Sequence, residues 1–515
     1  MSARLARIPA LLLAASLVAT CGTAPSPQPA TIQPIAPAAP GSPGAASAAA
    51  ASPGALAVSL GDAARAGISV DDILADLDRL QAIADASGGT RAAGTPGYDA
   101  SAAFVAGELQ AAGFTVQRMP VTLTAFSQDA PSRLEIPGGP AIEDIHDFKA
   151  MTYSASGDVT AKVVALGWDP NATAADRNGL GCNPADWTGV PSGVIVLVQP
   201  GPCRRHDAVV LAQQAGVLAI VTTYAAWPRD GVLRPTLVTP SDIRIPVIGA
   251  THAVGAALAQ AAGAGTTVHL ATSTSVREIQ SDNVIAASPW GDPGDVIMLG
   301  GHLDSVIDGP GINDNGSGTM TVLEIARTMA ELARSRPAGR GPNLGLRVAF
   351  WTGEEEGLFG SAAYAAGLTA ADVAATDAYL NFDMLGSPNG VRVVYQEVGA
   401  SRAAEEATIS GFFGQALDGA HLAWEPEAIG AASDHFPIEQ AGIPIGGLYS
   451  GANELMTPEE AATFGGEAHA PEDACYHLAC DTTSNVDAGL LGELARTAAE
   501  VAGQLLAGEL HLVDS

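Results

Sequence analysis

Lysine is nearly absent from this chain, and basic residues of any kind are scarce. Only Lys149 and Lys162 are lysines, and 24 basic residues stand against 55 acidic ones, for a formal net charge of −31. A surface of this charge repels phosphate backbones and anionic lipid headgroups. The composition therefore argues against a nucleic-acid partner and against electrostatic attachment to a membrane.

A long apolar run is also lacking. The N-terminal apolar stretch, residues 8–20, is shorter than the roughly 18–20 residues that a membrane-spanning helix requires. It follows two arginines and runs into Val-Ala-Thr-Cys at residues 18–21, which is the pattern of a signal peptide with a lipobox-like end. We expect residues 1–21 to direct export. We also expect Cys21 to carry a lipid that holds the protein at the outer face of the cell membrane, with ordinary secretion as the alternative.

Cysteine is rare as well, with five residues in the whole chain. If Cys21 carries a lipid, Cys182, Cys203, Cys475 and Cys480 remain, and four cysteines allow three pairings. Proximity in the sequence favours the disulfides Cys182–Cys203 and Cys475–Cys480. An oxidising compartment outside the cytoplasm would preserve both bonds.

The chain changes character at several points. Residues 22–60 are rich in Pro, Ala and Ser without hydrophobic periodicity, which predicts a tether. Residues 61–127 show two amphipathic helices, the first beginning near Val70, followed by a strand. Residues 128–276 contain short β runs and many turns, whereas strands and helices alternate through 277–515. This alternation predicts an α/β sandwich with a mostly parallel central sheet, interrupted by a smaller β-rich domain.

Polar clusters follow the predicted strands, at the edge where open α/β sheets bind their ligands. The clusters are His302 with Asp304, Asn313 with Asp314, Glu354 with Glu355 and Glu356, Asp383, and Tyr476 with His477. Two imidazoles and several carboxylates form a mixed nitrogen and oxygen ligand set that suits Zn²⁺ at a hydrolytic centre. Each cluster alone is also typical of a solvated helix start or a polar loop. Their occurrence at successive strand ends is what favours a metal site.

These motifs resemble those of peptidase family M28, the co-catalytic zinc aminopeptidases of the kind that streptomycetes secrete. The resemblance rests on Gly-Thr-Arg-Ala-Ala-Gly-Thr-Pro-Gly-Tyr (89–98), Gly-His-Leu-Asp-Ser (301–305), Gly-Ile-Asn-Asp-Asn-Gly-Ser-Gly (311–318), Trp-Thr-Gly-Glu-Glu-Glu-Gly-Leu-Phe-Gly-Ser (351–361), Tyr-Leu-Asn-Phe-Asp-Met (379–384) and Cys-Tyr-His (475–477). The inserted segment resembles a protease-associated (PA) domain, through Gly-Cys-Asn-Pro-Ala-Asp (181–186) and Gly-Pro-Cys (201–203). The resemblance implies a three-layer zinc-peptidase fold in two pieces, 61–127 and 277–515, around a PA domain of 128–276.

The resemblance also implies roles for the site residues. It implies two zinc ions, one held by His302 and Asp383, the other by Glu355 and His477, with Asp314 bridging them. Glu354 is then the general base toward a zinc-bound water, Tyr476 donates a hydrogen bond to the tetrahedral oxyanion, and Asp304 orients the His302 ring. We further expect a cis peptide bond between Asp314 and Asn315. Calcium is left open as a further cofactor, because no motif indicates where it could bind.

Three functional alternatives follow from these implications. The leading hypothesis is a monomeric aminopeptidase acting on peptides. A carboxypeptidase of the same family is the second, although no arginine cluster accompanies the zinc motifs. A binding protein that has lost its metal ligands is the third, and all the ligands are present here. Close relatives commonly carry Arg at the position of Ala432, so how the substrate's terminus is recognised stays open. His435, in the same string, is expected in the core or behind the ligands.

Overall fold

A computed structural model describes residues 58–171, 179–223, 232, 234–337, 340–396, 401–510 and 512. The predicted signal peptide, the lipidation of Cys21 and nearly all of the predicted tether lie outside the described residues. The chain forms two compact units, one running up to Leu123 and again from Gln280, the other spanning Thr124–Ile279. Within the described residues, no helix combines the length and the apolar character needed to cross a membrane.

The larger unit is built on a mostly parallel sheet, as the sequence predicts. Its central strands β13 (Ile445–Tyr449), β10 (Thr376–Phe382), β8 (Asp292–His302) and β9 (Leu344–Trp351) lie in that order and run parallel. Beyond β9 lies the antiparallel strand β7 (Thr267–Ala287), which pairs with β1 (Thr115–Glu135). At the other edge, β11 (Val393–Tyr395) runs antiparallel to β13 and pairs with β12 (Glu425–Glu427).

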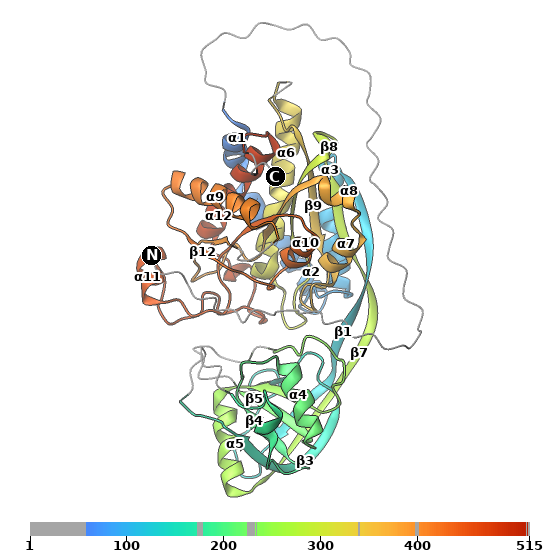
Figure 1. Cartoon of the computed structure of the whole chain (residues 1–515), viewed down its shortest axis with the longest axis vertical. Helices are drawn as coiled ribbons and strands as arrows, with labels where there is room; N and C mark the ends of the chain where they lie inside the picture. The colour runs from blue at the N-terminus through green and yellow to red at the C-terminus, as the bar shows by residue number, and fades with distance from the viewer. Residues whose placement is uncertain are drawn as a thin grey trace. The chain divides into compact units, whose positions relative to one another are not determined.

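Helices cover both faces of this sheet, which gives three layers (Figure 1). Successive strand residues point to opposite faces, so Leu299 and Phe350 enter one core while Met298 and Ala349 enter the other. The first core includes α1 (Leu60–Gly67), α2 (Val70–Ala86), α3 (Pro96–Ala112), α6 (Gly318–Ser335), α9 (Ala403–Gly419) and α12 (Ala488–Leu506). The second includes α7 (Phe359–Gly367), α8 (Ala370–Ala374), α10 (His435–Gln440) and α11 (Pro458–Phe464).

Helix α1 differs from expectation, because the sequence predicts a tether up to residue 60 and helix only from Val70. The structure begins α1 at Leu60, with Ser59 capping it through a hydrogen bond from the Asp62 amide. Leu60 and Ala64 are buried in the first core. A helix of eight residues is too short for its apolar spacing to stand out in the sequence.

In the smaller unit the strand order is β7-β3-β4-β5-β6-β2, where Thr267–Thr272 of β7 pair with β3. Its strands are β2 (Phe148–Ala150), β3 (Gly157–Leu166), β4 (Ile195–Val198), β5 (Ala219–Thr223) and β6 (Val247–Ala250), and its helices are α4 (Arg205–Gln214), α5 (His252–Ala264) and the short 3-10 helix η1 (Pro184–Trp187). Because α4 and α5 belong to separate cores on the two faces, β4 and β5 are buried along their length, β4 being entirely apolar and β5 ending in two buried threonines. The expected disulfide Cys182–Cys203 is present.

Candidate metal centre

The structure brings the predicted ligands together at one edge of the larger unit. His302 ends β8, Glu354 and Glu355 lie in the turn between β9 and α7, and Asp383 follows β10. Asp314 lies in η2 (Ile312–Ser317), directly before α6, and His477 lies in the loop before η3 (Thr483–Asn485). Because β8, β9 and β10 are parallel, the residues that follow them meet at the same edge of the sheet.

Asp314 is at the middle of this group. Its Oδ1 lies 3.2 Å from Nε2 of His302, and its Oδ2 lies 3.1 Å from Nε2 of His477. The same nitrogen of His302 is 3.3 Å from Oδ1 of Asp383, and that of His477 is 3.1 Å from Oε2 of Glu355. The ligand atoms thus form two triads that share Asp314, each with its atoms within 4.8 Å of one another. One carboxylate that offers a different oxygen to each triad could bridge two metal ions.

An unpaired polar atom indicates that these residues fit a bound cation. Oε1 of Glu355 is buried and accepts no hydrogen bond, whereas the buried Oδ1 of Asp383 lies 3.3 Å from the ring nitrogen of His302. An unsatisfied buried polar atom costs about 1–3 kcal/mol, which a cation would offset. Burial alone would lower the pKa of His302, but Asp383, Glu354 and Asp314 outweigh it and raise the pKa well above its usual value. Imidazole and carboxylate ligands surrounded by excess negative charge are a donor set that suits Zn²⁺.

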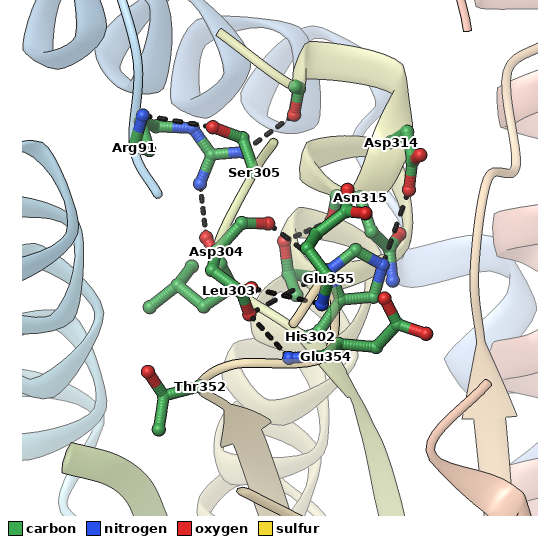
Figure 2. Close-up of polar contacts among 12 residues, drawn as sticks. Arg91, His302, Leu303, Asp304, Ser305, Asp314, Asn315, Thr352, Glu354 and Glu355 are labelled. Atoms are coloured by element: carbon green, nitrogen blue, oxygen red, sulfur yellow. Dashed lines mark hydrogen bonds and ion pairs between the residues drawn. The ribbon is translucent and has the colours of Figure 1, made fainter. Parts of the chain in front are cut away.

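Asp304 makes a different contact from the expected one. The backbone carbonyl of Asp304 lies 3.1 Å from Nδ1 of His302, whereas its nearer carboxylate oxygen is 3.9 Å from that nitrogen. The carboxylate instead accepts hydrogen bonds from the amides of Glu354 and Glu355, each at 3.3 Å (Figure 2). Asp304 therefore fixes the imidazole with its main chain and the Glu354–Glu355 turn with its side chain.

The main chain around Asp314 is held by a residue that sequence reasoning missed. Asp481 accepts hydrogen bonds from the amides of Asn313, at 2.8 Å, and Asp314, at 3.0 Å. The expected cis peptide bond between Asp314 and Asn315 is confirmed. Asp481 carries no motif of its own, and its place next to Cys480 is the only signal that could have drawn attention to it.

The loop that carries His477 is closed by the expected disulfide Cys475–Cys480. Between the two cysteines, the ring of Tyr476 stacks on His477 with 3.8 Å between centroids. Burial raises the pKa of Tyr476 well above its usual value, and the charges of Asp314 and Glu355 add to the shift. Its hydroxyl is therefore a hydrogen-bond donor at neutral pH.

The string that contains Ala432 contributes a second unpredicted contact. Oγ of Ser433 donates to Oδ2 of Asp383 at 2.6 Å and accepts from the side chain of Asn381 at 3.0 Å. His435 is fully buried, with Nε2 2.6 Å from the carbonyl of Gly430, and burial lowers its pKa to about 4. Ser433 thus turns Asp383 toward His302, and His435 belongs to the core.

The smaller unit holds no comparable group among its described residues. All three clusters able to hold a metal lie in the larger unit. His206 contacts the neighbouring Asp207 and the carbonyl of Ser241, and His252 packs on Trp168. Neither histidine belongs to a cluster able to hold a metal, so we interpret both as structural or surface residues.

Comparisons with known proteins agree with this geometry. The model of peptidase family M28 matches residues 283–502, and that of the PA domain matches 159–258. The chain is 34% identical over 435 residues to an aminopeptidase of Pseudomonas aeruginosa, covering 82% of this chain and 78% of that one. It is 36% identical over 454 residues to the probable lipoprotein aminopeptidase LpqL of Mycobacterium tuberculosis, covering 85% of each.

Solved structures share the fold. An aminopeptidase from Aneurinibacillus sp. strain AM-1 superposes with a TM-score of 0.67 at 24% identity, covering 88% of this chain and 98% of that one. A zinc aminopeptidase from Bacillus subtilis gives 0.61 at 22% identity, covering 84% and 94%.

The fold and the site define a metallohydrolase of the three-layer α/β class. The chain belongs to peptidase family M28, with a PA domain inserted, and is a metallo-aminopeptidase. Peptides are accordingly its substrates.

Proposed function

We propose that this protein is an exported di-zinc aminopeptidase that hydrolyses the N-terminal bond of peptides, with Glu354 as the general base. The observation that carries the proposal is the central carboxylate of Asp314, whose two oxygens each face a different imidazole, 3.2 and 3.1 Å away. In this assignment His302 and Asp383 hold one ion, Glu355 and His477 hold the other, and Asp314 bridges them.

Zinc, when bound, supplies Lewis acidity that lowers the pKa of water and polarises a peptide carbonyl. Glu354 is suited to the proton transfer because its amide donates to Asp304, while its carboxylate lies close to the imidazole of His302 and the carboxylate of Glu355. It takes the proton of the attacking water and delivers it to the leaving amine. The Tyr476 hydroxyl donates to the oxyanion that forms on the carbonyl oxygen.

The surroundings favour a free amine over a free carboxylate as the substrate's terminus. Several carboxylates lie at the metal centre, and their negative charge attracts the ammonium group at the N-terminus of a substrate. Arg91, which lies beside the centre in Figure 2, donates to three backbone carbonyls and is not available to a substrate carboxylate. Arg91 therefore does not supply the cation that a carboxypeptidase needs to bind a substrate carboxylate.

A substrate panel tests this function. Aminoacyl 4-nitroanilides, their N-acetylated counterparts and N-blocked dipeptides are assayed with the purified protein, after chelator treatment and after zinc is restored. We expect hydrolysis of the free aminoacyl substrates alone, lost with chelator and restored by zinc. Cleavage of the N-blocked dipeptides would instead identify a carboxypeptidase, and no cleavage in any arm would support a binding protein.

Export with a lipid at Cys21 completes the proposal. Two disulfides suit an oxidising compartment, and a relative is named as a probable lipoprotein. A Cys21→Ala variant should move the aminopeptidase from the membrane fraction to the soluble one. If the variant is distributed as the wild-type protein is, the protein either is secreted without a lipid or is attached to the membrane by another feature.

A further inference from the structure

Arg91, in the loop between α2 and α3, is a fully buried arginine to which no role has been assigned so far. Its guanidinium donates three hydrogen bonds to backbone carbonyls: Nε to Pro310 at 2.8 Å, one terminal nitrogen to Gly311 at 2.5 Å, and the other to Leu303. Burial lowers its pKa to about 10, while Asp304, Asp481 and Asp314 oppose the shift, so the side chain stays charged at neutral pH.

These three carbonyls belong to the segment that joins two proposed metal ligands. Leu303 directly follows His302, and Gly311 comes three residues before Asp314. The segment between them has no helix or strand and so cannot hold its own ends in place. The side chain of Arg91 contacts both ends of this loop, at Leu303 and at Gly311.

Neighbouring polar groups reinforce the contact. The amide of Arg91 donates to Oγ of Ser305 at 2.9 Å, and Ser305 donates to the carbonyl of Gly309 at 2.9 Å. Thr90 donates through Oγ1 to the carbonyl of Val306 at 2.9 Å. The 90–91 dipeptide therefore meets the loop at its ends and in its middle, as Figure 2 shows for Arg91, Leu303 and Ser305.

We propose that Arg91 is a positioning residue that fixes the separation of His302 and Asp314 before the metal binds, and thereby raises the affinity for zinc. The inference rests on the proposed di-zinc function. A planar guanidinium presents five donors in a rigid fork, and this fork matches carbonyls that converge from several directions. A lysine ammonium is a single point on a flexible stem and cannot contact both ends of the loop in one arrangement.

The test compares Arg91→Lys and Arg91→Met with Arg327→Met. Arg327 is a matched control, since it joins α6 to α2 and α3 through Asp76 and Glu108 but lies away from the ligands. For each protein, the zinc dissociation constants are measured by competition with a fluorescent chelator, and the thermal midpoint is measured without metal. Both Arg91 variants should lose about 10- to 100-fold in zinc affinity. Arg327→Met should lose thermal stability with zinc affinity within about twofold of wild type.

A Ser305→Ala variant keeps the proposal testable if the Arg91 variants fail to fold. Removing this hydroxyl loosens the same loop and should weaken zinc binding in the same direction, by a smaller factor. Wild-type zinc affinity in a folded Arg91→Lys or, failing that, in Ser305→Ala would overturn the proposal. Failure of the di-zinc function is a separate result, because the wild-type protein itself would then bind no zinc.

Discussion

Glu354 and Glu355 are chemically identical neighbours to which the proposed mechanism gives different tasks. Glu355 contacts His477 in one of the two ligand triads that share Asp314, whereas Glu354 belongs to neither of these. Changing each to Gln preserves its shape and removes its charge. The two variants should therefore fail in different ways.

Glu355→Gln should lose zinc. The carboxylate has one oxygen 3.1 Å from His477 and another that is buried without a partner. A neutral amide there is a poor ligand and leaves polar atoms unpaired, at about 1–3 kcal/mol. That range corresponds to a loss of about 5- to 150-fold in affinity for one ion.

Glu354→Gln should instead keep both zinc ions and nearly the same KM. Its kcat should fall by about 10²–10⁴, the usual contribution of a positioned acid or base, which corresponds to about 3–5.5 kcal/mol of barrier. Metal analysis of the purified proteins and steady-state kinetics at saturating zinc separate the two results.

Glu356→Gln is the matched control, because Glu356 lies in the same turn but in none of the three candidate metal clusters. It should change neither metal content nor kcat by more than about twofold, because Glu356 contributes no atom to any of these clusters. Loss of zinc in Glu354→Gln, with zinc kept in Glu355→Gln, would refute the reasoning and shift the assignment by one residue.

Two further predictions concern residues around the site and in the core. Ser433→Ala removes the hydroxyl that holds Asp383 and should weaken zinc binding by about tenfold, whereas Ser433→Thr, which keeps the hydroxyl, should lose less. Chelator competition measures both, and equal affinity in all three proteins would contradict this role. Burial raises the pKa of Glu324 to about 6, against the opposing amide of Ser69 and charge of Arg327, so the folded state binds its proton more tightly than the unfolded chain. The protonated Glu324 carboxyl contributes stability that is fully present below about pH 4.5 and is lost as the pH rises through 6. Glu324→Gln should therefore raise the free energy of unfolding by about 1–2 kcal/mol at pH 7.5, and by nothing at pH 4.5. Urea unfolding of the metal-free proteins checks this, and a gain that is equal at both pH values would exclude the carboxyl as its cause.

The grouping of the proposed ligands at one edge could be predicted because their signals are local. An apolar run precedes His302, Glu355 and Asp383 in each case, and the structure places these runs in β8, β9 and β10. Parallel strands end at the same edge of their sheet, so the order of strand and polar residue was enough to gather the three. The end of α3 at Gly113 is also a local feature, because its φ of +97° is the left-handed geometry that glycine adopts most readily.

The supporting residues could not be predicted, because their contacts join distant parts of the chain. Asp481 binds the amide of Asp314 across 167 positions, and Ser433 binds Asp383 across 50. Arg91 reaches Leu303 across 212. Arg91 lies in a quoted motif, Ser433 in the string that contains Ala432, and Asp481 next to Cys480, but nothing local shows which distant group each of them contacts.

The sequence by itself therefore determined the fold class, the family and the identity of the groups able to bind metal, since periodicity, strand ends and motif order are properties of neighbouring residues. The tertiary structure alone decided how these groups face one another. It placed the carboxylate of Asp304 on the amides of the Glu354–Glu355 turn instead of the His302 ring, and it buried Arg91 among carbonyls. Hydrogen-bond direction and burial depend on which surfaces the folded chain brings together, and that information is spread over the whole molecule.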